Sequence, residues 1–453
     1  MTDQRVSELF RGADPGDGPA LPEGYAERLV AVGRRGVRRR RALGGSVVLV
    51  VLLAVGLLGL GPLPSRSPQP ATAVTGVSLP DRLAPFSFRT GTIGDAPLDR
   101  AVMIFEYGSG ETINVWQRLA LGADGNSYRQ LDGIPPGTPW LLTADGRAVV
   151  TTEASRATSA FTVLDLSTGL RHQFRLPAPV AVALLASSPD GRYVAYSATP
   201  YQGSSSVIGE VEQTARERGT LTLLDLTDGR TTTVTGVEAV SAAAFSPDGG
   251  SLAVQSGAET WIVDRAGQRL RRVATPGGFV LAPRVAWSPD GRLLAVQPKD
   301  SFSGTGASDP YEVRFVDAVA DAPVPPPVSA EQLLGWRSPD RVLALTLDGI
   351  SELPLRGGDP VVLTRPDRGN SCEYHMQPCL ALEIRAATAL LPTLTVRSGD
   401  DPDRGPWPAP VRQVVAVGSL LAAALAGVLV WRSRPRWSRA GQRGRMVLAK
   451  RRR

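Results

Sequence analysis

The sequence has few of the side chains that most enzymes use for acid–base or metal chemistry. Its 453 residues include only two histidines and two cysteines. It contains no Gly-x-Ser-x-Gly elbow, Walker A lysine loop or His-Glu-x-x-His pair, which are the signatures of α/β-hydrolases, P-loop nucleotidases and zinc peptidases. Any general acid–base catalysis would therefore depend on carboxylates. We predict no catalytic residue, no metal ligand and no cofactor.

Lysine is also scarce, since arginine supplies every basic side chain except Lys299 and Lys450. This bias indicates a high-GC bacterial genome. The net charge of +7 and the pI of 9.8 would by themselves favour a nucleic-acid partner. The basic residues, however, are concentrated in segments 1–42 and 432–453, and the body between them is mildly acidic. We therefore predict contact with anionic lipid headgroups and no nucleic-acid partner.

Charge is missing altogether from two long apolar segments, residues 43–62 and 413–431. At about 1.5 Å per residue, either helix could cross a hydrocarbon core of about 30 Å. We predict transmembrane helices over 43–62 and 412–431. A cleaved signal peptide is the alternative for the first segment. The 42 residues before it and the distant Ala-x-Ala at 71–73 favour an uncleaved signal-anchor.

Arginines adjoin both predicted spans and set the expected orientation. Arg38 to Arg41 precede the first span, and Arg432, Arg434 and Arg436 follow the second. Because positively charged flanks stay in the cytoplasm, we predict a double-pass protein of the cell membrane with both termini cytoplasmic. The predicted division is a cytoplasmic segment 1–42, a Pro-rich linker 63–80, an extracytoplasmic body 81–398, a linker 399–411 and a basic cytoplasmic tail 432–453.

The body contains a repeated tetrapeptide. Ser-Pro-Asp-Gly occurs at 188–191, 246–249 and 288–291, with weaker copies at 143–146 and 338–341. A short apolar segment follows each copy, such as Tyr193–Tyr196. The aspartates of successive copies are 45, 58, 42 and 50 residues apart. A strand-rich unit that repeats every 40–50 residues or so is typical of β-propeller blades, so we predict an all-β body.

The chemistry of the tetrapeptide suits a tight turn. Proline presets φ, aspartate accepts bonds from nearby amides and glycine adopts the left-handed conformation. A ring of ligand-binding residues is the alternative, but the same chemistry recurs in every repeat, which favours turn formation. The predicted structural turn residues are Asp145, Pro189, Asp190, Gly191, Pro247, Asp248, Gly249, Pro289, Asp290, Gly291, Pro339 and Asp340.

These motifs resemble the WD40-like repeat of TolB-type propellers, whose blades carry S-P-D-G-[RK]-x-[LI]-A-[FY]. The resemblance extends over about residues 80–398, and it implies a propeller fold. The chain departs from the pattern at Asp340-Arg341 and over 85–135. Strand groups predict six blades at 86–133, 140–176, 184–236, 243–275, 284–325 and 332–363. Residues 380–397 either close the ring or form a seventh blade.

The two cysteines lie close together in the predicted outward part. Cys372 and Cys379 are separated by a segment that contains His375 and Met376. An oxidising compartment and an even cysteine count favour a disulfide that closes a short loop. A soft-metal site that uses the same histidine and methionine is the alternative.

Together these features predict a membrane-anchored extracytoplasmic propeller that acts as a binding, scaffold or sensor module. Its irregular insertions, at 200–219, 301–310 and 366–378, are the predicted contact surface for a protein or envelope ligand. The alternative is a lactonase-like extracytoplasmic hydrolase whose channel carboxylates hold calcium. The sequence favours a non-catalytic module and leaves the enzyme alternative open.

Overall fold

The computed structural model describes residues 76–433, except 85–86, 88, 108–116, 135–136, 154, 206, 208, 300–309, 320–322, 367–380 and 400. The chain separates into two units, residues 66–412 and residues 1–65 together with 413–453. The N-terminal segment, the span predicted at 43–62 and both cysteines lie outside the described residues.

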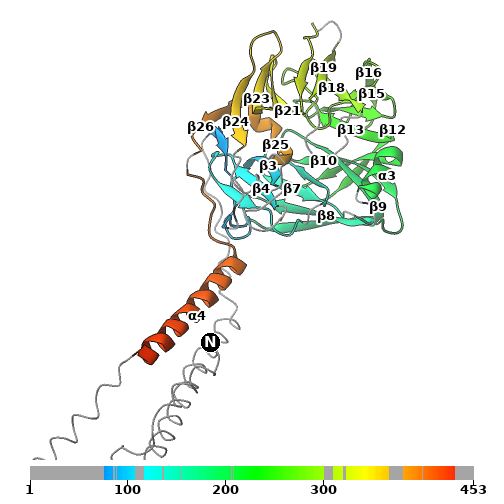
Figure 1. Cartoon of the computed structure of the whole chain (residues 1–453). Helices are drawn as coiled ribbons and strands as arrows, with labels where there is room; N and C mark the ends of the chain where they lie inside the picture. Colours follow the sequence, from blue (N-terminus) through cyan, green and yellow to red (C-terminus); the bar gives the residue numbers. More distant parts are fainter. Residues whose placement is uncertain are drawn as a thin grey trace, which may run out of the picture. The chain divides into compact units, whose positions relative to one another are not determined.

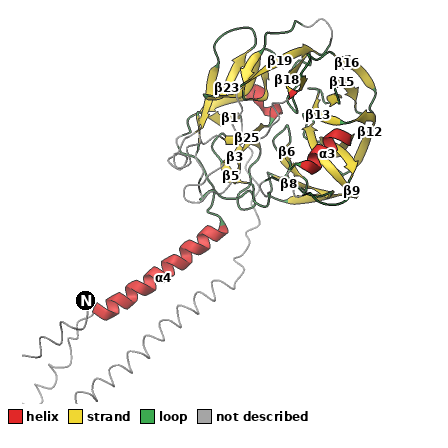
Figure 2. Cartoon of the chain, turned by 45° about the vertical axis from the view of Figure 1, so that its right-hand side comes forward, coloured by secondary structure: helices red, strands yellow, loops and turns green. Residues whose placement is uncertain are grey.

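The larger unit consists mainly of antiparallel strands arranged as successive meanders (Figures 1 and 2). Strands β13 (Val240–Phe245), β14 (Ser251–Ser256), β15 (Glu259–Asp264) and β16 (Arg269–Val273) form one sheet. Strands β17 (Phe279–Leu281), β18 (Leu293–Pro298), β19 (Tyr311–Asp317) and β20 (Val328–Ala330) form the next. Each repeat turn connects one strand to the next, and in four of the five turns a glycine with positive φ reverses the chain.

A five-stranded sheet follows in the sequence. Its strands are β21 (Gln332–Ser338), β22 (Arg341–Thr346), β23 (Gly349–Pro354), β24 (Val361–Pro366) and the short N-terminal β2 (Arg82–Leu83). The last of these pairs in parallel with β24. Strand β1 (Val77–Pro80) likewise pairs in parallel with β26 (Leu394–Arg397), so the two ends of the body are held together.

The first meander is completed by a strand from the end of the body. Strands β3 (Ala101–Tyr107), β4 (Gln117–Gly122) and β5 (Tyr128–Gln130) are joined by β25 (Ala381–Ala386), which pairs antiparallel with β3. Residues 381–386 therefore close a sheet that begins near residue 101. The short 3₁₀ helix η3 (Thr388–Thr393) follows.

The largest sheet contains seven strands. They are β6 (Trp140–Leu142), β7 (Ala148–Thr151), β8 (Thr158–Asp165), β9 (Arg171–Ser187), β10 (Tyr193–Pro200), β11 (Thr220–Asp225) and β12 (Thr231–Glu238). The first part of β9 pairs with β8 through Arg171↔Leu164, and its second part pairs with β10 through Ser187↔Val194. This strand thus belongs to two successive four-strand meanders.

Three sheets of four strands and one of five have the size and topology of propeller blades, among the described residues. The prediction of an all-β, propeller-like body is confirmed. The apolar segments that follow the repeat turns lie in β10, β14, β18 and β22, as predicted.

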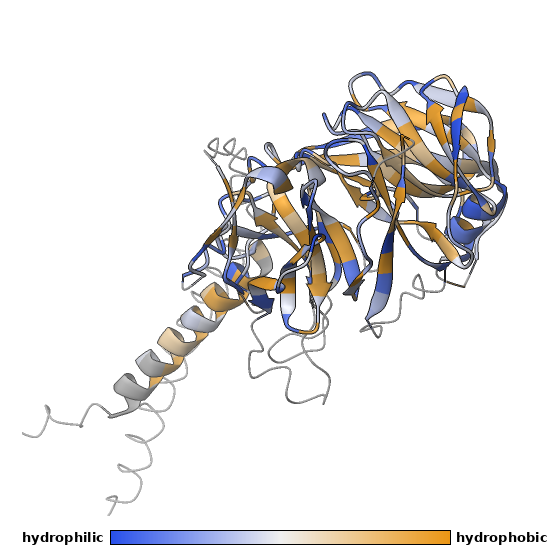
Figure 3. Ribbon diagram, turned by 90° about the horizontal axis from the view of Figure 1, so that it is seen from above, coloured by the Kyte–Doolittle hydropathy of each residue, from blue (hydrophilic) through white to orange (hydrophobic). Residues whose placement is uncertain are grey.

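The first strands of successive meanders lie side by side. Strand β9 contacts β6 and β13, β13 also contacts β17, and β21 contacts β25. Indole hydrogen bonds cross between sheets: Trp287 Nε1 donates to Ala244 O at 3.1 Å, and Trp336 Nε1 donates to Val285 O at 2.9 Å. Hydrophobic residues run along these strands (Figure 3), and they form clusters that extend from one sheet to the next. Packing between neighbouring sheets therefore holds the ring together.

Among the described residues, two α-helices depart from the all-β pattern. Helix α3 (Glu210–Arg218) interrupts the β10–β11 hairpin and buries Val211 and Ala215 against β9, β10 and β13. Helix α4 (Ala409–Ser433) contains the span predicted at 412–431. Within the part of the chain that the structure describes, no helix has the length and apolar character needed to cross a membrane. Both predicted spans stay predictions.

Candidate functional site

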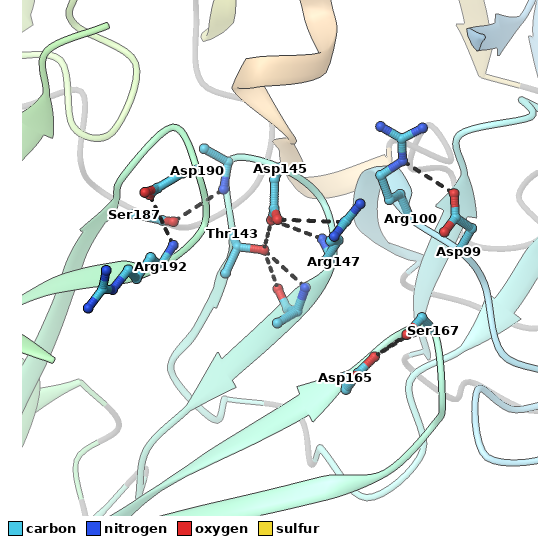
Figure 4. Close-up of polar contacts among 12 residues, drawn as sticks. Asp99, Arg100, Thr143, Asp145, Arg147, Asp165, Ser167, Ser187, Asp190 and Arg192 are labelled. Carbon is cyan, nitrogen blue, oxygen red and sulfur yellow. Dashed lines mark hydrogen bonds and ion pairs between the residues drawn. The ribbon is translucent and has the colours of Figure 1, made fainter. Parts of the chain in front are cut away.

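The repeat turns form closed hydrogen-bond motifs. Ser188 Oγ donates to Asp190 Oδ1 at 2.5 Å and accepts from the amide of Tyr193 at 2.8 Å. Asp190 Oδ1 also accepts from the amide of Arg192 at 3.1 Å. Gly191 has a φ of +72°, which a glycine adopts without strain. Figure 4 shows this turn beside the equivalent turn that contains Asp145.

Three of the other copies repeat all of these bonds, and the copy at 338–341 repeats the hydroxyl–carboxylate bond. The hydroxyl–carboxylate distances are 2.7 Å for Thr143–Asp145, 2.6 Å for Ser246–Asp248, 2.6 Å for Ser288–Asp290 and 2.5 Å for Ser338–Asp340. The bonds from Ser246 and the Gly250 amide lower the pKa of Asp248. These carboxylates are occupied by groups of their own turns. The structure places them in separate turns and does not bring them into one site.

One turn arginine also connects two strands of its meander. Arg192 donates to Asp225 Oδ2 through Nε at 3.0 Å and through Nη2 at 2.7 Å. Asp225 lies at the end of β11, and the bond from Arg192 lowers the pKa of its carboxyl group to about 2. The pair links the turn to the third strand, so its role is structural.

A group of arginines lies around the first strands of the meanders. Four arginines from separate elements approach one another there, and we call them the inner arginine cluster: Arg118 of β4, Arg216 of α3, Arg284 after β17 and Arg385 of β25. Arg216 and Arg284 bond to carbonyl oxygens of the neighbouring strands β13 and β9, and Arg118 and Arg385 both lie over the ring of Trp140. The insertion helix α3 and the closing strand β25 thus supply charge to the same region.

Trp140 organises one side of this cluster. Its ring lies 4.9 Å from the guanidinium carbon of Arg118 and 4.1 Å from that of Arg385. Its Nε1 donates to Glu383 Oε2 at 3.2 Å, and its carbonyl oxygen accepts from Arg385 Nη1. The side chain of Trp140 is buried, so both cation–π contacts form in a region largely shielded from water.

Two members of the cluster have carboxylate partners. Arg118 pairs with Glu106 in a buried contact, although its Nε and Nη1 have no hydrogen-bond partner. Arg216 pairs with Glu212 at 2.6 Å and donates to Ser241 O on β13. These contacts fix α3 on the neighbouring sheet.

Arg284 is the exception in the cluster. Its Nη2 makes a long bond of 3.4 Å to Leu184 O, and its Nε is shielded from solvent without a hydrogen-bond partner. Among the described residues it forms no ion pair. Burial, with the charges of Arg385 and Arg216, lowers its pKa well below the usual range. Because a guanidinium stays protonated in proteins, this charge is stabilised poorly by its surroundings.

None of the site residues predicted from the sequence belongs to this cluster. Arg284 lies in the apolar segment Phe279–Trp287, and a lone arginine in such a segment is the signal that could have identified it. Its neighbours come from distant parts of the chain and leave no local pattern. Within the described residues, no three His, Cys, Asp or Glu side chains form a group that could hold a metal ion. Cys372 and Cys379 lie outside the described residues.

No family model matches the chain, and no curated protein matches it. Similar solved structures include TolB from Acinetobacter baumannii, with 17% identity, a TM-score of 0.37, and coverage of 59% of this chain and 68% of that one. An oligogalacturonate lyase in complex with manganese has 14% identity and a TM-score of 0.38, covering 56% and 72% of the two chains. A protein assigned as TolB from Agrobacterium tumefaciens has 14% identity and a TM-score of 0.33, covering 58% and 87%.

Proposed function

We propose that this chain is a membrane-anchored extracytoplasmic propeller of six blades that recognises a protein or envelope ligand through its inner arginine cluster. The single observation that carries the proposal is that α3, an insertion in one hairpin, packs on β9 and β13, where Arg216 donates to Ser241 O and Arg284 donates to Leu184 O. An insertion in one hairpin that packs on the first strands of two meanders is suited to selectivity, since the repeated turns already form the scaffold.

The blade count rests on the pairing of β9. Its two parts serve two meanders, so the seven-stranded sheet corresponds to two blades. The four sheets that contain β13, β17, β21 and β25 each correspond to one further blade, which gives six blades. The sheet of β3, β4 and β5 is one of these six blades, and β25 completes it.

The membrane anchor is supported by composition and by surface chemistry. Segments 43–62 and 413–431 lack charge and are flanked by arginines. In α4, Val414, Leu421 and Leu425 are exposed, and an exposed row of large aliphatic side chains needs an apolar environment. We place the propeller outside the cell and both termini inside it.

The chemistry of the cluster fits recognition. Guanidinium groups remain protonated near neutral pH and therefore neither give nor accept protons there. Their fixed planar donors suit binding of anionic groups. A hydrolytic role would need a free carboxylate or other nucleophile, whereas the carboxylates described beside these arginines, Glu106, Glu212 and Glu383, are bonded to Arg118, Arg216 and the Trp140 indole.

The test is recovery of the partner from crosslinked membranes that contain the full-length protein. We expect Arg216→Ala to reduce recovery at least fivefold, since it removes the contribution of α3 to the cluster. Arg218→Ala is the matched control, because Arg218 lies on the same helix but is exposed. Equal recovery with all three proteins, or turnover of an ester, lactone or glycan by the purified protein, would contradict the proposal.

A further inference from the structure

We propose that Arg284 binds an oxyanion of the ligand, a carboxylate or phosphate group, beside the first strands β9 and β13. This inference rests on the proposed recognition function and specifies the chemical class of the group that is recognised. None of the predicted turn residues contributes a side chain to this position.

The carboxylates that act on Arg284, Glu212 and Glu383, are each bonded to another side chain. Arg118 and Arg216 have Glu106 and Glu212 as ion-pair partners, and Glu383 accepts a bond from the Trp140 indole. Arg284 has only the long bond to a carbonyl oxygen. In the described part of the chain, the region therefore carries one more guanidinium than its carboxylates compensate. An anion would neutralise this excess.

Burial makes the excess positive charge of Arg284 energetically unfavourable when no ligand is bound. The Nε of Arg284 is both shielded from water and without an acceptor, so the charge is neither hydrated nor paired there. The side chain as a whole is only partly buried, which leaves part of it accessible. An oxyanion at the accessible part would restore the missing stabilisation through charge-assisted hydrogen bonds.

Backbone conformation is a second, independent observation. In the described part of the chain, three non-glycine residues have positive φ: Ala239, Arg284 and Glu383, at 51°, 70° and 50°. Two of these carry charged side chains of the same region. A positive φ costs a non-glycine residue on the order of 1 kcal/mol, and such residues concentrate at binding sites. The amide of Arg284 donates to Ala243 O at 2.9 Å, which helps hold the conformation.

Carboxylate and phosphate share the feature that Arg284 would recognise, namely two oxygens in one plane that can accept from one guanidinium. Separate probes distinguish the two groups. Sodium phosphate and sodium acetate are titrated into the full-length protein in detergent, against sodium chloride at matched ionic strength. Thermal unfolding and calorimetry report binding, since a ligand of the folded state raises the midpoint in a saturable way.

We expect a saturable rise in Tm with at least one of the two anions and none with chloride. Arg284→Ala should weaken that binding at least tenfold, and Arg284→Lys should give an intermediate loss because lysine keeps the charge but not the planar donors. Arg175→Ala is the control, since Arg175 is exposed on β9 and its loss changes the net charge equally. If Arg284→Ala does not fold, Arg284→Gly, which tolerates the positive φ, replaces it.

The inference is overturned if neither anion gives a saturable shift, or if Arg284→Ala and Arg284→Gly respond as the wild type does. Failure of this inference can be distinguished from failure of the proposed function. A protein whose partner recovery depends on Arg216 but whose Tm ignores both anions recognises a ligand without an oxyanion at Arg284. A protein that binds phosphate or acetate through Arg284 but recovers no partner supports the anion site alone.

Discussion

The repeat turns and the inner arginine cluster use polar side chains in opposite ways. In the turns, each of the five aspartates accepts a bond from its own serine or threonine, and four of them also accept one from a nearby amide. In the cluster, each arginine comes from a different element, and polar atoms of Arg118 and Arg284 have no partner. Satisfied, repeated chemistry belongs to the scaffold, whereas unsatisfied, unique chemistry indicates where a ligand contributes.

The largest expected effect is in the buried ion pair of the cluster. Glu106→Gln removes the carboxylate that compensates Arg118, whose side chain is 3% exposed. An uncompensated buried charge should lower the free energy of unfolding by about 3–5 kcal/mol. Urea denaturation measures it. Glu312→Gln is the control, because its pair with Arg314 is exposed and should contribute little to stability. Equal losses in both variants would contradict the distinction.

The next effect tests the conformation of the turns. Gly146 has a φ of +73°, and a Cβ there would lie 2.3 Å from Ala101 O. Gly146→Ala should therefore destabilise the protein by about 2–3 kcal/mol. Gly277→Ala, where a Cβ meets nothing within 4 Å, is the comparison and should change stability little. Thermal unfolding of the two variants measures the difference, and a Gly146→Ala protein as stable as the wild type would refute a turn role for this glycine.

A smaller effect concerns the pH dependence of the Arg192–Asp225 pair. The folded pKa of Asp225 is lowered from 3.8 to about 2 by the bond from Arg192, so the pair stabilises the fold above about pH 4. That stability is lost as the pH falls through the folded pKa. Because Arg192 is half-exposed, we expect Asp225→Asn to cost about 1–2 kcal/mol at pH 7 and much less near pH 2. Denaturation at the two pH values checks this, and a constant difference would disprove it.

The smallest effect tests whether the turn aspartates serve only the scaffold. Asp248→Ala removes bonds to Ser246 and Gly250 and should cost about 1 kcal/mol of stability. Partner recovery should fall only in proportion to unfolding. A loss of recovery in fully folded Asp248→Ala protein would assign this turn to the binding surface.

The sequence predicted those parts of the fold that local chemistry determines. The turn tetrapeptides and the strands after them follow from proline, glycine and alternating apolar residues, and β10, β14, β18 and β22 confirm this. Closure of the first sheet by β25 was only one of two alternatives, because strand pairing over some 280 residues leaves no local signal.

The cluster could not be predicted for the same reason. Arg284 and Arg385 lie 101 residues apart in the sequence, and only the ring brings their strands together. The insertion at 200–219 was predicted as a variable contact surface, but its nine-residue helix α3 also buries Val211 and Ala215 in the core. A short helix with a mostly polar sequence has a weak hydrophobic periodicity, so tertiary packing determines whether it forms.

The central claim is that binding depends on the inner arginine cluster and not on the repeated turns. The most direct measurement compares recovery of the crosslinked partner by full-length wild-type, Arg284→Ala and Asp248→Ala proteins at equal folded concentrations. The account predicts at least a tenfold loss for Arg284→Ala and no loss for Asp248→Ala. Undiminished recovery with Arg284→Ala, or an equal loss with Asp248→Ala, would contradict it.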